Sequence, residues 1–416
     1  MKVNGIIAEY NPFHNGHKYH LDFSKQTTGA DYTIVVMSGN FTQRGIPAIT
    51  DKKKRAKAAL LSGADLVLEL PAYYAASSAE YFAMGSVSLL DKLGVTDCLC
   101  FGSECDDLSF LTQVASILET EPPVYQSALR ESLRLGNSFP KARQEALVCC
   151  LADSAFFAAS LSEPNTLLAL EYLKALKRRK SRIKPVPIKR IGEGYHSLSL
   201  DTSFCSASAL RNRIGHSPVP GEDLYRDLSR HIPPEALNCL VQDLQNAAPV
   251  TADAFSSQLC YKLLCEESAG FADYADVTQD LSDRIRKMLP EFQSFTSFCD
   301  LLKTKNLTYT RISRSLTHIL LNQKASALQE YCSLDYIFYA RVLGFRKDAQ
   351  PLLTALKANS CIPLVTGAAS AAVLTHPCAQ SMLAQDLLAA HIYHTAAHAD
   401  GLLSIPNEFR TPVVIC

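Results

Sequence analysis

The chain has 416 residues, of which 47% are apolar and 20% charged, and its 41 basic residues equal its 41 acidic ones. This composition is typical of a folded protein with more than one core, and it excludes a disordered chain. Zero net charge excludes a uniformly basic surface, so any nucleic-acid-binding surface must be a local patch. No apolar stretch reaches the ~20 residues that a membrane helix requires.

Fourteen cysteines are scattered along the chain without a CxxC pair, so the usual spacing of a zinc site is absent from the sequence. Met1–Asn4 leads directly into an apolar run, and we expect no signal peptide before it. These features predict reduced thiols, a cytoplasmic location and no membrane partner.

Apolar runs alternate with helical segments over the first half of the chain. The predicted strands are Gly5–Ala8, Asp31–Gly39, Ala64–Pro71, Thr96–Gly102 and Pro185–Ile191. The predicted helices are Lys18–Lys25, Lys52–Ser62, Ala79–Lys92 and most of residues 107–176. Such alternation predicts right-handed βαβ units and a doubly wound, Rossmann-like parallel sheet, which makes the fold class α/β.

The alternation fades beyond about residue 216, where helical patterns dominate. Two prolines and two glycines within Gly215–Gly221 favour a boundary there. We therefore expect an α/β domain over residues 1–215 and a mainly helical C-terminal domain over residues 216–416.

Asn11–His17, directly after the first predicted strand, is the most informative segment. Pro12 favours a turn, and Asn15-Gly16 allows the backbone to approach a ligand closely. His14 and His17 stand at a strand-to-helix junction, where free N–H groups and the helix dipole favour a phosphate. Ligands of parallel sheets bind at this edge, so the segment predicts a phosphate-binding site.

A second motif begins another predicted helix, with the hydroxyl groups of Ser206 and Ser208 and the guanidinium of Arg211. Serines at a helix start and an arginine fork can together bind a terminal phosphate. Ordinary capping of a surface helix is the alternative interpretation. The presence of the first motif favours the phosphate.

These paired motifs resemble the nucleotidyltransferase superfamily, and the sequence is similar to one family within it, the bacterial tRNA(Met) cytidine acetate ligases. The first half carries the resemblance on Gly5–His17, Ser38–Gly45, Gly63–Pro71, Phe101–Glu104, Pro164–Asn165, Lys189–Gly192 and Tyr195–His196. The second half adds Tyr309–Arg314 and Arg341–Phe345. Ala207 and Ala209 depart from the serine and threonine that the superfamily often has there.

The resemblance implies an ATP-dependent ligase that works in two steps. Acetate first reacts with ATP to give acetyl-adenylate and pyrophosphate. The acetyl group then passes to N4 of the wobble cytidine, C34, of elongator tRNA(Met), giving N4-acetylcytidine and AMP. The implied partners are therefore ATP, acetate and tRNA rather than DNA.

The resemblance also implies site residues, with catalytic roles for His14, His17 and Arg211. The implied ATP-binding residues are Ile7, Ala8, Glu9, Tyr10, Asn11, Pro12, Phe13, His14, Asn15, Gly16, His17, Lys18, Tyr19, His20, Gly102, Asn165 and Arg190, with Ser206 and Ser208 at the leaving pyrophosphate. Mg²⁺ is a reasonable companion of ATP, although no carboxylate pair in the sequence marks its ligands.

Basic residues are concentrated in two places. Lys174–Arg190 holds nine lysines and arginines in seventeen positions. Such a run is usually a solvated helix face, but its place just before the second motif predicts a tRNA-binding surface. The predicted tRNA-binding residues are Lys177, Arg178, Arg179, Lys180, Arg182, Lys303, Lys305, Arg311 and Arg314.

His391, His394 and His398 are spaced to share one helix face. Metal binding is one interpretation, but no cysteine or carboxylate pattern accompanies the histidines. We therefore predict an exposed late helix and no metal site.

Three other functions remain open on the residues alone. HxGH is compatible with a nucleotidyltransferase that acts on a small-molecule phosphate or acid. A non-catalytic tRNA-binding protein could keep the same fold, although it would not need phosphate-binding side chains such as Arg211. A class I aminoacyl-tRNA synthetase begins with a similar turn, but this chain lacks a KMSKS-like loop.

Overall fold

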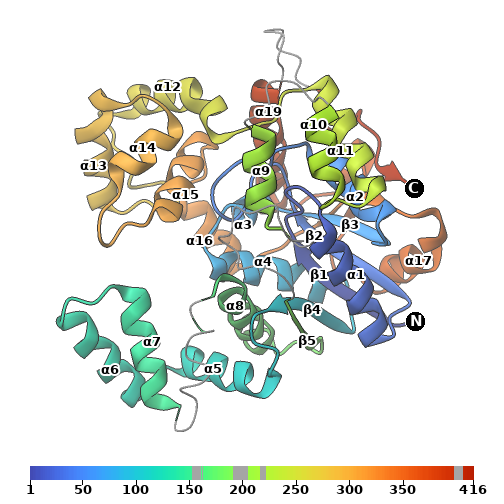
Figure 1. The fold of residues 1–416 in the computed structure, drawn as a ribbon, viewed down its shortest axis with the longest axis horizontal. Helices are drawn as coiled ribbons and strands as arrows, with labels where there is room; N and C mark the ends of the chain where they lie inside the picture. The colour runs from blue at the N-terminus through green and yellow to red at the C-terminus, as the bar shows by residue number, and fades with distance from the viewer. Residues whose placement is uncertain (152–160, 162, 191–204, 216–221, 398–405) are drawn as a thin grey trace.

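The computed structural model describes residues 1–151, 161, 163–190, 205–215, 222–397 and 406–416 (Figure 1). The motif positions 191–192 and 195–196, the boundary positions 216–221 and His398 lie outside the described residues. The strands are β1 (Val3–Ala8), β2 (Tyr32–Ser38), β3 (Leu66–Leu70), β4 (Cys98–Ser103), β5 (Lys184–Lys189), β6 (Ala340–Phe345), β7 (Leu364–Val365) and β8 (Val414–Ile415).

Helices fill most of the remaining chain. Up to residue 215 they are α1 (Asn15–Thr28), α2 (Lys52–Leu61), α3 (Ala72–Ala75), α4 (Ala79–Lys92), α5 (Leu108–Thr120), α6 (Pro123–Arg134), α7 (Phe139–Cys150), α8 (Pro164–Arg178) and α9 (Ala207–Gly215). Later helices are α10 (Glu222–Ser229), α11 (Pro234–Asn246), η3 (Ala252–Phe255), α12 (Ser256–Glu266), α13 (Gln279–Met288), η4 (Leu289–Glu291), α14 (Phe295–Leu302), α15 (Tyr309–Leu320), α16 (Ala325–Ser333), η5 (Lys347–Ala349), α17 (Gln350–Asn359), α18 (Ala368–Ala371) and α19 (Pro377–Ala397).

The first five strands form a parallel sheet, as the sequence predicts, and the structure shows their order to be β5-β4-β1-β2-β3. Strand β1 has β2 on one side and β4 on the other, so successive connections run in opposite directions from it. The carboxyl end of β1 is therefore the topological switch point, where ligands of doubly wound sheets bind. His14 and His17 follow β1 directly at this point.

Alternate residues of β2 show why helices cover both faces of the sheet. Ile34 and Val36 belong to the core under α4, α5 and α8, whereas Val35 and Met37 belong to the core under α1, α2 and α11. All four side chains are fully buried. A strand buried on both faces is continuously apolar, which is the pattern that predicted it.

The second half of the chain contributes strands as well as helices, and these extend the predicted parallel sheet at the β3 edge. Strand β6 pairs antiparallel with β3, joining Glu69 to Arg341 and Leu66 to Phe345, and β7 and β8 pair with β6. The run Arg341–Phe345 is too short for its period to reveal a strand, and its partner lies far away in the sequence. The sheet thus contains residues from both sides of position 215.

Helices α12–α15 form a lobe with its own apolar core beside the sheet (Figure 1). The loop between β2 and α2 attaches this lobe, because the carbonyl oxygen of Gly45 accepts hydrogen bonds from Ser313 Oγ at 2.8 Å and Thr317 Oγ1 at 2.7 Å. Gly45 has a φ of +68°, and its Cα faces the backbone of Arg314 with no room for a side chain. The loop is therefore packed directly on α15.

All fourteen cysteines of the chain are free thiols. Among the described residues, no helix combines the length and the apolar character needed to cross a membrane.

Candidate active site at the carboxyl ends of the parallel strands

His14 and His17 bind the backbone at the start of α1. Nδ1 of His14, the N-cap residue, accepts a hydrogen bond from the N–H of Gly16 at 3.1 Å, and Nδ1 of His17 accepts one from the N–H of His14 at 3.2 Å. The two rings stack with centroids 3.7 Å apart. A neutral imidazole carries one proton, so an accepting Nδ1 places that proton on Nε2. Each ring therefore presents an Nε2–H donor on its opposite edge.

These histidines are held in their neutral form. Burial, with the charges of Arg190 and Arg211 nearby, lowers the pKa of His14 to about 3. Burial and the neighbouring His14 lower the pKa of His17 well below its usual value. Burial and Arg190 lower the pKa of His20 to about 4. At pH 7 the imidazoles are thus uncharged donors, and the positive charge around them comes from the two arginines.

The second motif lies against the first, although 200 residues separate Arg211 from Asn11. Nη1 of Arg211 donates to the carbonyl oxygen of Asn11 at 2.7 Å, and Nη2 donates to Ser208 Oγ at 2.9 Å. Ser206 Oγ accepts a hydrogen bond from the N–H of Ala209 at 3.1 Å, as a capping serine does. The structure therefore brings Arg211 and Ser208 to the histidine turn, while Ser206 caps α9.

Three other predicted residues meet at the ends of β4 and β5. Arg190 Nη1 lies 3.4 Å from Asn165 Oδ1, and a Cβ atom on Gly102 would lie 3.4 Å from Arg190 Cγ. The side chain of Arg190 thus lies across Gly102 at the end of β4. Its effect on the pKa of His14, His17 and His20 places its charge in the same site as the imidazoles.

The aromatic side chains of the first motif pack around His17. The ring centroid of Tyr10 lies 4.9 Å from that of His17 and 4.8 Å from that of Phe13. Lys18 instead binds Asp22 on the surface of α1, with Nζ and Oδ2 2.5 Å apart. The predicted ATP-binding residues therefore divide into an inner group beside the imidazoles and outer ones such as Lys18.

Sequence reasoning missed His231, which precedes α11. Its carbonyl oxygen accepts a hydrogen bond from the backbone N–H of Asn15 at 2.8 Å, and the neighbouring Arg230 carbonyl accepts one from Asn15 Nδ2 at 3.0 Å. The charge of His231 also contributes to the lowered pKa of His14. No motif surrounds His231, so only the folded chain reveals its place.

Sequence reasoning also missed Arg55, a fully buried residue of α2. Its Nη1 donates to the carbonyl oxygens of Glu9 at 2.6 Å and Ser38 at 3.1 Å, and Nε donates to that of Thr50 at 3.1 Å. Its Nη2 donates to the carbonyl of Gly39. One arginine thus fixes the ends of β1 and β2 and the start of α2, and an isolated arginine in a lysine-rich helix gives no such signal.

The basic run around residue 180 is partly neutralised, because two of its arginines form ion pairs with carboxylates. Arg178 binds carboxylates on α4 and α5, and Arg179 binds carboxylates on α4 and in the segment before β6. Lys177 donates to a serine hydroxyl on α5 at 3.1 Å, while Lys180 and Arg182 are exposed. Sequence could not show this, because the acidic partners lie far from the run.

The second basic cluster, composed of Lys303, Lys305, Arg311 and Arg314, likewise contains both paired and exposed residues. Arg314 is 12% exposed and its Nε binds Asp276 at 2.9 Å, so its charge is used inside the protein. Lys305 Nζ donates to a backbone carbonyl in the α6–α7 turn at 2.6 Å. Lys303 is exposed and Arg311 half-buried on the same lobe.

The sequence predicts that the helix carrying His391 and His394 is exposed, and this prediction was wrong. Helix α19 is packed into the fold, and His394 is 15% exposed, with Nε2 3.6 Å from Asp51 Oδ2 and 3.6 Å from Glu408 Oε1. His391 is half-buried on the same helix. Among the described residues, no group of three or more His, Cys, Asp or Glu side chains is placed to hold a metal ion.

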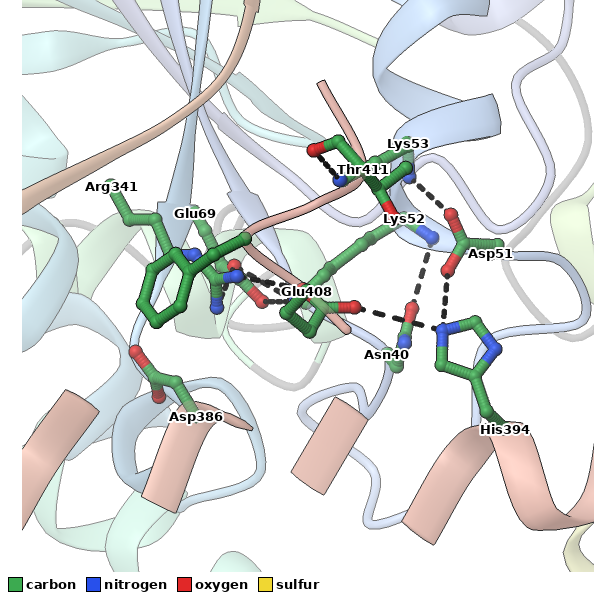
Figure 2. A network of polar contacts seen from close by, with 12 residues as sticks. Asn40, Asp51, Lys52, Lys53, Glu69, Arg341, Asp386, His394, Glu408 and Thr411 are labelled. Atoms are coloured by element: carbon green, nitrogen blue, oxygen red, sulfur yellow. Dashed lines mark hydrogen bonds and ion pairs between the residues drawn. The ribbon is translucent and has the colours of Figure 1, made fainter. Parts of the chain in front are cut away.

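Figure 2 shows the ion-pair network that His394 joins beside β3. Glu408 accepts from Lys52 Nζ at 2.9 Å and from Arg341 Nη2 at 2.7 Å. Glu69 binds the same two cations, at 2.8 Å and 3.1 Å. These four side chains are all at most 6% exposed. The network therefore joins α2, β3, β6 and the segment before β8 through buried charges.

The structure combines neutral imidazole donors at the switch point of a parallel sheet with an arginine fork beside them. This combination is typical of a nucleotide-binding protein of the nucleotidyltransferase class. Residues 1–402 match the HIGH Nucleotidyl Transferase family. The chain belongs to this family and, within it, to the tRNA(Met) cytidine acetate ligases.

Two named relatives and two solved structures support this assignment. A tRNA(Met) cytidine acetate ligase of Thermoanaerobacter sp. (strain X514) is 42% identical over 88% of each chain, and that of Acetivibrio thermocellus is 38% identical over 100% of each chain. The crystal structure of apo Thermotoga maritima TmcAL aligns with a TM-score of 0.91 at 30% identity, over 100% of this chain and 99% of that one. TmcAL bound with alpha-thio ATP aligns with a TM-score of 0.89 at the same identity and coverage.

Proposed function

We propose that this chain is an ATP-dependent ligase that acetylates N4 of the wobble cytidine of elongator tRNA(Met). In the first step a carboxylate oxygen of acetate attacks the α-phosphorus of ATP. The bond to the bridging oxygen breaks, and pyrophosphate leaves with that electron pair. In the second step N4 attacks the acetyl carbon, AMP leaves, and the nitrogen gives up a proton. The name shared by relatives at 38% and 42% identity supports this reaction.

The observation that carries the proposal is the pair of neutral imidazoles whose Nδ1 atoms accept from the backbone, which places each ring proton on Nε2. Carboxylic acids are ionised near pH 7, so acetate needs no general base in the first step. The barrier comes from charge on the transferring phosphate, which fixed donors stabilise without reorganising. His14 and His17 are such donors, because the backbone at the start of α1 occupies both Nδ1 atoms.

Arg211 and Arg190 would supply the positive charge that binds the phosphates, each at a different place in the site. Arg211, fixed by Asn11 and Ser208, would bind the leaving pyrophosphate with its outer edge. Arg190 and Asn165 would bind ATP near the ends of β4 and β5. A relative, Thermotoga maritima TmcAL, binds an ATP analogue, which supports ATP binding by this fold. Tyr10 and Phe13 pack around His17 and keep its ring in place.

Mg²⁺ would accompany ATP. Among the described residues, no group of three or more His, Cys, Asp or Glu side chains is placed to hold a metal ion. The ion would neutralise phosphate charge while bound to the triphosphate.

The tRNA would bind through a reduced basic surface composed of Lys177, Lys180, Arg182, Lys303 and Arg311. These are the predicted basic residues that form no ion pair with a carboxylate of another element and, unlike Lys305, are not directed to the α6–α7 turn. We place the reaction in the cytoplasm, a location with which fourteen free thiols agree.

One experiment tests the function. The protein is incubated with ATP, labelled acetate and a panel of unmodified tRNAs, and the digested tRNA is analysed for N4-acetylcytidine. We expect label in elongator tRNA(Met) alone, with AMP and pyrophosphate released in equal amounts. Pyrophosphate release that needs a different acid or phosphate acceptor would instead establish the small-molecule transferase. A protein that binds tRNA without consuming ATP would be the non-catalytic alternative.

A further inference from the structure

Glu104, one residue beyond the end of β4, binds the first turn of α8 with both carboxylate oxygens. Oε1 accepts from Asn165 Nδ2 at 2.6 Å. Oε2 accepts from the backbone N–H of Thr166 at 2.8 Å and from its Oγ1 at 3.0 Å. The carboxylate thus occupies the positive end of α8, where backbone N–H groups have no partner within the helix.

The same carboxylate also reaches Arg190. The Nε atom of Arg190 lies 3.8 Å from Glu104 Oε1, while its Nη1 lies 3.4 Å from Asn165 Oδ1. Because Glu104 accepts from the amide nitrogen of Asn165, the amide oxygen must face Arg190. One carboxylate therefore orients both an amide and a guanidinium.

We propose that Glu104 is a positioning residue for ATP, acting through Asn165 and Arg190 rather than by touching the nucleotide. This inference rests on the proposed function, since it assumes that Asn165 and Arg190 bind ATP. Glu104 is only 23% exposed, and every contact described for it is to these two residues or to Thr166. A cap for α8 alone would need only the two Thr166 hydrogen bonds.

The isosteric change Glu104→Gln separates these roles. Glutamine has one accepting oxygen, which we expect to remain on the two Thr166 donors, so its Nε2 faces Asn165. Two donors then oppose each other, and the Asn165 amide turns over and presents Nδ2 to Arg190. The α8 cap survives, whereas the Asn165–Arg190 contact is lost.

The measurements are the Kd for ATP by titration calorimetry without acetate, the KM and kcat of acetate-dependent pyrophosphate release, and the melting temperature. For Glu104→Gln we expect Kd and KM to rise about tenfold, as loss of one charge-assisted contact predicts, with kcat changed less than about threefold and the melting temperature nearly unchanged.

Asp107→Ala is the matched control, because Asp107 in the same loop caps α5 through the N–H of Phe110 at 3.0 Å without contacting Asn165 or Arg190. It should lower the melting temperature and leave the Kd for ATP unchanged. Wild-type affinity in Glu104→Gln, or a melting temperature lowered as far as in Asp107→Ala, would overturn the inference. The calorimetric Kd does not depend on acetate, so failure of acetate activation in the wild type would refute the proposed function without deciding the role of Glu104.

Discussion

Arg211 reaches back from α9 to the carbonyl oxygen of Asn11, 2.7 Å away, and this hydrogen bond joins the two motifs of the proposed nucleotide site. The same guanidinium holds Ser208 through its second nitrogen. A lysine has no fork and cannot serve both partners from one position.

Arg211→Lys should therefore reduce acetyl-adenylate formation about 100-fold, the usual cost of losing one fixed donor to a phosphoryl or oxyanion transition state. Pyrophosphate release measures this, and filter binding should show unchanged tRNA affinity. Arg213→Lys is the matched control on the same helix, because Arg213 binds Asp227 at 2.9 Å instead. Equal losses in both variants would mean that α9, not the fork, is responsible.

His17→Ala removes both an Nε2–H donor and the acceptor for the backbone N–H of His14. We expect no measurable acetyl-adenylate and nearly unchanged tRNA affinity in a filter-binding assay. If tRNA binding falls in parallel, the turn has a structural role only.

The lowered pKa of His14 has a consequence for stability against acid. Below pH 6.5 the unfolded chain protonates this histidine, whereas the folded chain does not until its pKa of about 3. The free energy of unfolding should therefore fall as pH drops from 6.5 toward 3, by up to about 1.4 kcal/mol per pH unit for this group. Urea unfolding at several pH values measures the slope. His14→Asn should flatten it, and an unchanged slope in that variant would contradict the assignment.

The buried ion pairs beside β3 predict a large cost for removing one partner. Lys52→Met leaves Glu69 and Glu408 with one cation, Arg341, between them. We expect the free energy of unfolding in urea to fall by about 3–5 kcal/mol. The control is Lys57→Met on the exposed side of α2, which should change it by no more than about 0.5 kcal/mol. Similar values for the two variants would refute the buried network.

Because Arg178 and Arg179 form ion pairs, the test of tRNA binding is best made on the other residues of the basic run. Exchanging Lys177, Lys180 and Arg182 for glutamate should weaken binding and reduce the slope of log affinity against log salt by about 2–3, if each residue meets one phosphate. Exchanging Arg178 and Arg179 for glutamine should chiefly lower the melting temperature, because their carboxylate partners lose their cations. An unaltered salt slope in the first variant would exclude this surface.

The sequence predicted the features that depend on neighbouring residues. The apolar runs of β1–β4, the turn at His14 and the helix that begins near Ser206 all leave local patterns, and motif pairing indicated that Arg211 lies near the turn. Features that depend on distant partners were missed. Glu104 belongs to a segment that carries the family resemblance, but its contact with Asn165 is visible only once α8 is placed against β4. Arg178 looks solvated until its acidic partners are known.

The antiparallel pairing of β6 with β3 limits how this chain can be divided. A fragment ending near residue 215 would leave the ladder of β3 open along Leu66–Glu69, an apolar strand edge of the kind that recruits other chains. Lys52 and Glu69 would also remain without Arg341 and Glu408. We therefore expect either half to aggregate when it is expressed alone, because each would expose the strand edge that the other covers.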